Sequence, residues 1–117
     1  MKKIYHLQTC NTCQRILKEI QPTSDFTLQE IKEAPVTAKQ LEEMKALAGS
    51  YESLFSKRAR LYKEKGLKDK TLSETDYKNY ILEHYTFLKR PVIIIDEQIF
   101  IGNSAKTVAA AKEAIAE

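Results

Sequence analysis

Two cysteines separated by two residues, Cys10 and Cys13, are the side chains in this chain best suited to covalent chemistry. They follow residues 2–7, whose alternating, β-favouring side chains predict a strand. Beyond Cys13, apolar residues recur at helical spacing as far as Ile20. Cys10 is therefore predicted to lie at the N-terminus of a helix. Unpaired N–H groups and the positive end of the helix dipole stabilise a thiolate at such a position.

This arrangement predicts Cys10 as a nucleophile and Cys13, one helical turn deeper, as the thiol that attacks a mixed disulfide on Cys10. A zinc site needs four ligands, and the spacing of His6 and His84 does not complete one, so no metal is expected. A structural disulfide is disfavoured because a reducing compartment is expected. Two buried structural cysteines remain the alternative to a redox function.

Composition predicts one domain, residues 1–117, with a modest net charge of +3. No run is long enough to span a membrane, and the apolar stretch after the first lysines is too short for a secretory signal. A soluble cytoplasmic protein without a membrane partner is therefore expected.

Seven basic residues lie in segment 57–70, where a solvated face is the simplest interpretation. An acidic partner, or glutathione near Arg58, is the alternative. No recognition-helix pattern is present, so direct DNA binding is not expected.

The remaining elements are expected in the order strand, helical block, two strands and helix. The capping box formed by Thr37 and Gln40 begins one helix. Ser73 begins another, which is expected to run to Leu88 because apolar side chains keep helical spacing that far. The strands are predicted at 25–31, 92–95 and 99–101, with a last helix after residue 104. This order predicts an α/β fold, a four-stranded mixed sheet flanked by helices, with a helical insertion at about 35–89 between strands 2 and 3.

The strand–CxxC–helix start and the Arg90-Pro91 step before a buried strand resemble the thioredoxin-like fold. The helical insertion narrows the resemblance to the ArsC/Spx/YffB family, which comprises arsenate reductases and their relatives, over nearly the whole chain. The motifs that carry it lie at residues 10–13, 56–58, 88–93 and 101–102. The resemblance implies that Pro91 sits against the active cysteine, usually after a cis peptide bond.

Individual positions match different members of that family. His6, four residues before Cys10, matches the histidine that helps to activate the thiol in glutathione/glutaredoxin-coupled arsenate reductases. Cys13 instead matches the CxxC of Spx, a redox-sensing transcriptional regulator. Ser56 stands where the arsenate reductases have an arginine, and no arginine follows Arg90. The resemblance thus implies an arsenate site weakened to one matched arginine of three.

A substrate oxyanion or carboxylate at Cys10 would meet the backbone amides of Asn11 and Thr12 at the helix N-terminus. Arg90 is expected to add charge-assisted hydrogen bonds, with Arg58 as a second cation. No bound cofactor is expected, and glutathione, thioredoxin or glutaredoxin is the expected external reductant, which makes a redoxin a candidate partner.

These features favour a small thiol-dependent reductase that forms a Cys10–Cys13 disulfide and acts on a small-molecule oxyanion or thiol substrate, with arsenate the less favoured of these. The alternative is a Spx-like regulator that binds RNA polymerase and uses the CxxC only as a redox switch.

Overall fold

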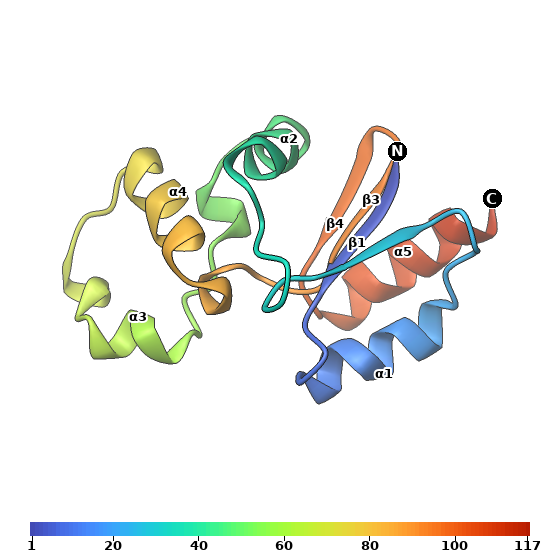
Figure 1. The fold of residues 1–117 in the computed structure, drawn as a ribbon, viewed down its shortest axis with the longest axis horizontal. Coiled ribbons are helices and arrows are strands. Elements are labelled where there is room, and N and C mark those ends of the chain that lie inside the picture. Colours follow the sequence, from blue (N-terminus) through green and yellow to red (C-terminus); the bar gives the residue numbers. More distant parts are fainter. The chain divides into compact units, whose positions relative to one another are not determined.

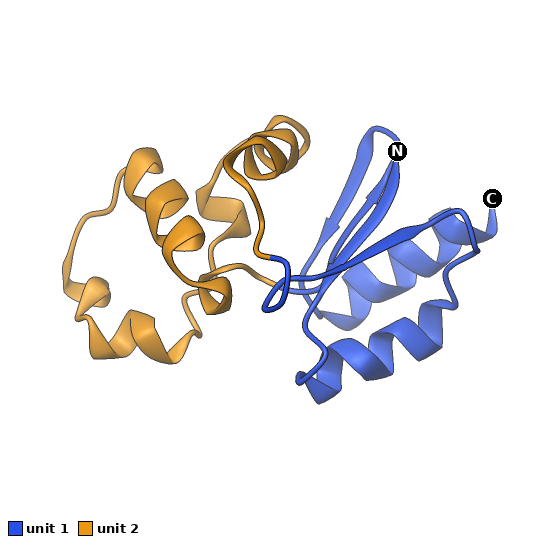
Figure 2. Ribbon diagram, in the orientation of Figure 1, with its two compact units in different colours: residues 1–34, 90–117 blue, residues 35–89 orange.

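A computed structural model describes residues 1–117, which form two compact units (Figure 2). Unit 1 combines Met1–Ala34 with Arg90–Glu117, and unit 2 is Pro35–Lys89. Unit 2 is entirely helical apart from its connections, and it is the helical insertion predicted between the second and third strands. None of the helices combines the length and the apolar character that a membrane span requires.

Unit 1 contains the sheet, which has the strand order β2-β1-β3-β4. β1 pairs with β2 in parallel, and the other two pairings are antiparallel, so the predicted mixed sheet is confirmed. The strands are β1 (Lys2–His6), β2 (Thr27–Glu30), β3 (Val92–Ile95) and β4 (Gln98–Ile101). Helices α1 (Asn11–Ile20) and α5 (Ala105–Ala116) contact each other and lie on the same side of the sheet (Figure 1).

The core of unit 1 lies between this face of the sheet and the two helices. Ile4 and Ile93 are register partners, so both side chains point to the same face. They pack with the inner sides of α1 and α5 in one buried cluster: Ile4, Ile16, Ile20, Ile93, Ile95, Val108 and Ala111. Full burial of an aliphatic side chain contributes roughly 1.5–3 kcal/mol. This cluster therefore fixes α1, and with it the cysteine pair at its start, against β1.

Unit 2 is built around an aromatic cluster. Phe55 stacks on Phe87 with ring centroids 5.2 Å apart, and the ring of Tyr77 lies 4.9 Å from Phe55. The elements are α2 (Ala38–Ala48), the 3-10 helices η1 (Glu52–Leu54), η2 (Leu67–Asp69) and η3 (Tyr85–Phe87), α3 (Arg60–Glu64) and α4 (Glu74–Glu83). The predicted capping box of Thr37 begins α2, and that of Ser73 begins α4.

The helix predicted to reach Leu88 ends earlier, at Glu83, and this prediction was wrong. His84 is extended, with φ −149° and ψ 133°, and its Nδ1 accepts the backbone N–H of Thr86 at 3.2 Å. This side-chain contact starts a separate 3-10 turn, after which Leu88 pairs with Phe55 in a short antiparallel bridge. The apolar side chains still face the aromatic cluster, so the helical spacing did not reveal the break.

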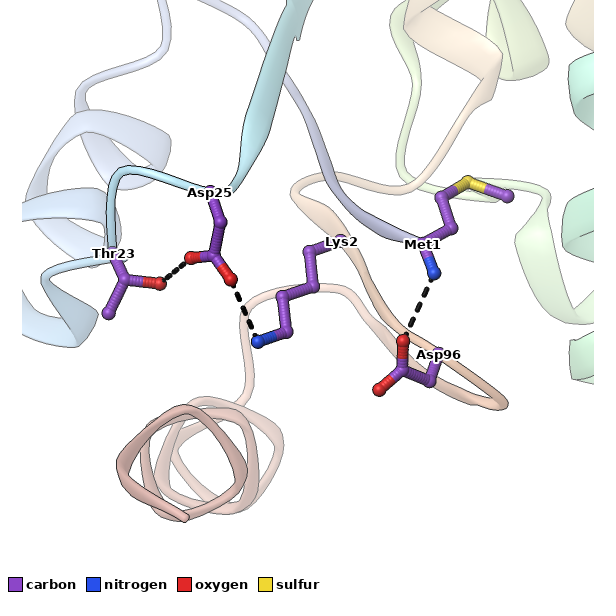
Figure 3. A network of polar contacts seen from close by, with 5 residues as sticks. All are labelled: Met1, Lys2, Thr23, Asp25 and Asp96. Atoms are coloured by element: carbon purple, nitrogen blue, oxygen red, sulfur yellow. Dashed lines mark hydrogen bonds and ion pairs between the residues drawn. The ribbon is translucent and has the colours of Figure 1, made fainter.

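A network of charged groups ties the start of β1 to two turns of unit 1 (Figure 3). The Lys2 ammonium lies 2.9 Å from the Asp25 carboxylate, which also accepts the Thr23 hydroxyl. The amino group of Met1 lies 3.0 Å from the Asp96 carboxylate, in the turn between β3 and β4. These exposed contacts lie at the end of the strand opposite to the cysteines.

Replacing Asp25 with Asn is expected to lower stability in a pH-dependent way. The hydrogen bond from the Thr23 hydroxyl, followed by the Lys2 ammonium, lowers the pKa of Asp25 from 3.8 to about 2. A pKa depressed by folding stabilises the folded state above the unfolded pKa, and this contribution disappears as pH falls toward 2. The urea midpoint of Asp25→Asn should therefore lie below wild type at pH 6 and converge with it near pH 2. Glu97→Gln, an exposed charge in the same unit, is the control. A gap that persists at pH 2 would contradict the prediction.

Candidate active site

Cys10 is the N-cap residue of α1, as predicted from the sequence. Its backbone is extended, with φ −92° and ψ 109°, and its carbonyl accepts the N–H of Gln14 at 3.1 Å to close the first helical turn. No side chain caps this helix. The thiol of Cys10 is only partly buried and therefore occupies the place where a capping oxygen or an anion would normally sit.

The surroundings of Cys10 favour its thiolate. Burial acts to raise the pKa of Cys10, but hydrogen bonds from the backbone and thiol of Cys13, the positive charge of Arg90 and the backbone N–H of Thr12 outweigh it. The net result is a pKa below the ordinary value of 9.0. Thiolates are the nucleophilic form of cysteine, so this residue is activated by its position.

Cys13 lies in the opposite kind of environment. Its side chain is fully buried in unit 1, on the inner side of α1. Burial, together with the neighbouring Cys10, raises the pKa of Cys13 to about 11 against the lowering effect of the Leu7 backbone and Arg90. At neutral pH Cys13 is therefore a protonated thiol that can donate a hydrogen bond to the Cys10 sulfur.

The turn before α1 is held by hydrogen bonds that the sequence pattern does not reveal. The carbonyl of Leu7 accepts the N–H of Cys10 at 3.1 Å and the side-chain Nε2 of Gln14 at 3.2 Å. The carboxylate of Glu30 accepts the N–H of Gln8 at 2.7 Å. Sequence analysis missed both Gln14 and Glu30, because a glutamine inside a helix and a glutamate ending a strand carry no signature of such contacts.

Arg90 is brought to the cysteines by the chain entering β3, where Pro91 follows it. Arg90 acts electrostatically on both thiols and favours the ionised form of each. The Arg90–Pro91 peptide bond is cis, and the buried Pro91 accepts the N–H of Gly102 through its carbonyl at 3.0 Å. The first turn of α1 thus holds Asn11, Thr12 and Cys13, and Arg90 of the same unit acts on both thiols. The role of Pro91 at the site stays a prediction.

Two predicted site residues are placed differently. His6 ends β1, pairs in register with Glu30 and helps to lower the pKa of that carboxyl. The groups that lower the pKa of Cys10 are Cys13, Arg90 and Thr12. The Nδ1 of His6 is shielded from solvent without a hydrogen-bond partner. Arg58 is an exposed residue of unit 2. The roles of His6 in thiol activation and of Arg58 in substrate binding stay predictions.

The basic segment of unit 2 is exposed at each of its cationic residues. Lys57 pairs with Glu52 at 3.1 Å, and Lys65 pairs with Glu83 at 3.3 Å. Such exposed pairs contribute little to stability, so the positive charges of this segment are not needed to hold the fold together.

Comparison with known proteins shows the family to which the chain is similar. The model of the ArsC family matches residues 5–111. An arsenate reductase of Yersinia enterocolitica is 30% identical over 93 residues, which cover 78% of this chain and 66% of that protein, slightly less than two thirds of its length.

Solved structures of related proteins share the fold. The arsenate reductase from Vibrio cholerae has a TM-score of 0.78 at 20% identity, covering 94% of this chain and 96% of that one. The structure described as a possible arsenate reductase from Streptococcus mutans has a TM-score of 0.65 at 26% identity, covering 85% and 87% of the two chains.

Proposed function

The chain belongs to the ArsC family, and on this premise we propose that it is a thiol-dependent reductase in which Cys10 is the nucleophile and Cys13 the resolving thiol. One observation carries the proposal. Two cysteines one helical turn apart have opposite environments, a partly exposed thiol with a lowered pKa and a fully buried thiol with a raised pKa. Two structural cysteines in a core would both be buried and inert.

The substrate class that these residues suit best is a disulfide or a glutathione adduct of a thiol. The Cys10 thiolate attacks one sulfur, the S–S bond of the substrate breaks, and the other sulfur leaves as a thiolate that takes up a proton. Cys13 then loses its proton and attacks the Cys10 sulfur, which releases the bound group as a second thiol. The substrate gains two electrons, and the protein is left with a Cys10–Cys13 disulfide.

The cycle closes when an external dithiol, or two molecules of glutathione, reduces that disulfide. Thioredoxin or glutaredoxin are the protein reductants of suitable chemistry. Arg90 supports both half-reactions because its positive charge favours each thiolate as it forms. In this proposal the first-turn amides of Asn11 and Thr12 bind an anionic group of the substrate, such as a glutathione carboxylate.

The test is turnover of a glutathione–peptide mixed disulfide. It is measured as the NADPH consumed when a coupling reductase regenerates the glutathione or thioredoxin that reduces the protein. Wild type should turn over, and Cys10→Ser should fall to the background rate because the nucleophile is lost. In Cys13→Ser, the half of the substrate that stays bound to Cys10 cannot be displaced internally, so intact mass without added reductant should show one adduct on Cys10. Turnover that survives Cys10→Ser would contradict the proposal.

The same assay tests Arg58 against a neighbour of the same kind. Arg58 and Arg60 are both exposed and lie two residues apart. If Arg58 binds substrate, Arg58→Ala raises KM while Arg60→Ala does not. A chain that did not turn over the mixed disulfide, yet captured RNA polymerase only when oxidised, would establish the regulatory alternative instead.

A further inference from the structure

Glu30 joins two turns at one edge of the sheet of unit 1. It is the last residue of β2, directly opposite His6 at the end of β1. One carboxylate oxygen accepts the N–H of Gln8 at 2.7 Å. The other accepts the N–H groups of Lys32 at 2.6 Å and Glu33 at 3.0 Å. A single half-buried carboxylate thus receives three backbone donors from two segments of the chain.

The Gln8 contact matters because Gln8 lies inside the turn that carries Cys10. The Leu7 carbonyl accepts the Cys10 N–H and closes this turn. Within the turn, the Glu30 carboxylate accepts the N–H of Gln8. The backbone of Glu30 is held in the turn after β2, because its carbonyl accepts the N–H of Ala34 at 2.8 Å. Glu30 is therefore anchored on one side and bound to the Cys10 turn on the other.

We propose that Glu30 is a positioning residue for Cys10, whose carboxylate fixes the Leu7–Cys10 turn so that the thiol meets the N–H groups of the first turn of α1. The proposal rests on the proposed function of Cys10 and adds the residue that sets its geometry. Hydrogen bonds from backbone N–H groups to a thiolate weaken steeply with misalignment. A loosened turn therefore costs thiolate stability without removing any group that touches the sulfur.

Positioning and simple electrostatics have opposite consequences here. Glu30 is negatively charged, so if it acted on Cys10 only through its charge, its removal would favour the thiolate and lower the thiol pKa. If it positions the turn, its removal raises that pKa. The direction of the change therefore separates the two roles.

The experiment is the pH dependence of iodoacetamide alkylation of Cys10 in the folded protein. Glu30→Gln keeps one acceptor oxygen but directs an NH₂ group at backbone donors, so one of the two turns is released. The midpoint of its rate profile should rise by about 0.5–1 pH unit relative to wild type. Glu30→Ala loses every acceptor and should shift the midpoint at least as far.

Glu33→Gln is the matched control, because Glu33 lies in the same turn, carries the same charge and is exposed. Its midpoint should stay at the wild-type value. A midpoint for Glu30→Gln that is unchanged or lowered, in protein whose melting curve is still cooperative, would overturn the proposal. The alkylation profile is independent of turnover, so a shift in a chain that turns over no substrate would reject the proposed function and retain the positioning role.

Discussion

Brief alkylation of the folded, reduced protein at pH 6 is expected to modify Cys10 on the order of a hundred times faster than Cys13. The first reason is the difference in thiolate population. The pKa of Cys10 lies below 9.0 because its hydrogen bonds and Arg90 outweigh burial, and burial raises that of Cys13 to about 11. Well below both values, two pH units correspond to at least about a hundredfold difference in thiolate.

Intrinsic nucleophilicity and access modify this ratio in opposite directions. The more acidic thiolate is the weaker nucleophile, which reduces the advantage of Cys10 by roughly tenfold for a two-unit difference. Cys13 is fully buried, so the reagent reaches it only after local opening of the structure. The burial of Cys13 therefore offsets the lower nucleophilicity of the Cys10 thiolate, and the expected ratio of the two alkylation rates stays on the order of a hundred.

The measurement is peptide mapping by mass spectrometry after timed quenching. In urea the two cysteines should react at similar rates, because both environments are lost, and this denatured sample is the control. Arg90→Ala should slow Cys10 at pH 6, since its positive charge favours the thiolate. Equal labelling in the folded state, or faster labelling of Cys13, would show that the assigned roles of the two thiols are wrong.

Local sequence signals predicted most of what positions this site. The capping residues Thr37 and Ser73 both begin helices, and the branched run at 92–95 is a fully buried strand. The placement of Cys10 at a helix N-terminus followed from the strand and helix periods on either side of it. Each of these features depends on a few neighbouring residues, so one sequence was sufficient.

The features that were missed depend on contacts between distant residues. Glu30 binds Gln8 across 22 positions of the chain, and only the parallel register of β1 and β2 brings them together. The break after Glu83 depends on His84 bonding to Thr86 in preference to continuing the helix. Apolar spacing reports which side chains face a core, and it remains the same when a helix gives way to a 3-10 turn around that core.

Arsenate reduction by this protein is expected to be weak or absent, although we expect Cys10 to be reactive. A tetrahedral oxyanion is held by several fixed donors, and the arsenate reductases that the chain resembles draw on three arginines. Unit 1 supplies Arg90 and the first-turn amides of α1, and Ser56 stands where another arginine would be. Each lost charge-assisted contact costs about 1.5–3 kcal/mol, so two losses weaken oxyanion capture by roughly a hundredfold or more.

The prediction is tested with arsenate in the glutathione- and glutaredoxin-coupled assay, beside the mixed disulfide used above. We expect the mixed disulfide to be turned over at least about a hundred times more efficiently, as kcat/KM, than arsenate. Ser56→Arg restores the residue type that the arsenate reductases have at this position, so it should raise kcat/KM for arsenate by about tenfold or more, with little effect on the mixed disulfide. Thr71→Arg adds the same charge at an exposed position of unit 2 and should change neither substrate.

The two variants separate a specific oxyanion contact from a general effect of positive charge. If both arginine variants raised arsenate turnover equally, net charge would be the cause, and the missing contact at Ser56 would not explain weak activity. Robust arsenate turnover by wild type, lost in both Cys10→Ser and Arg90→Ala, would show that one arginine and the amides of a helix N-terminus are enough to capture the oxyanion. In that case the absent arginines would bear on affinity for competing anions such as phosphate, measurable as inhibition, and arsenate would be a substrate of this site.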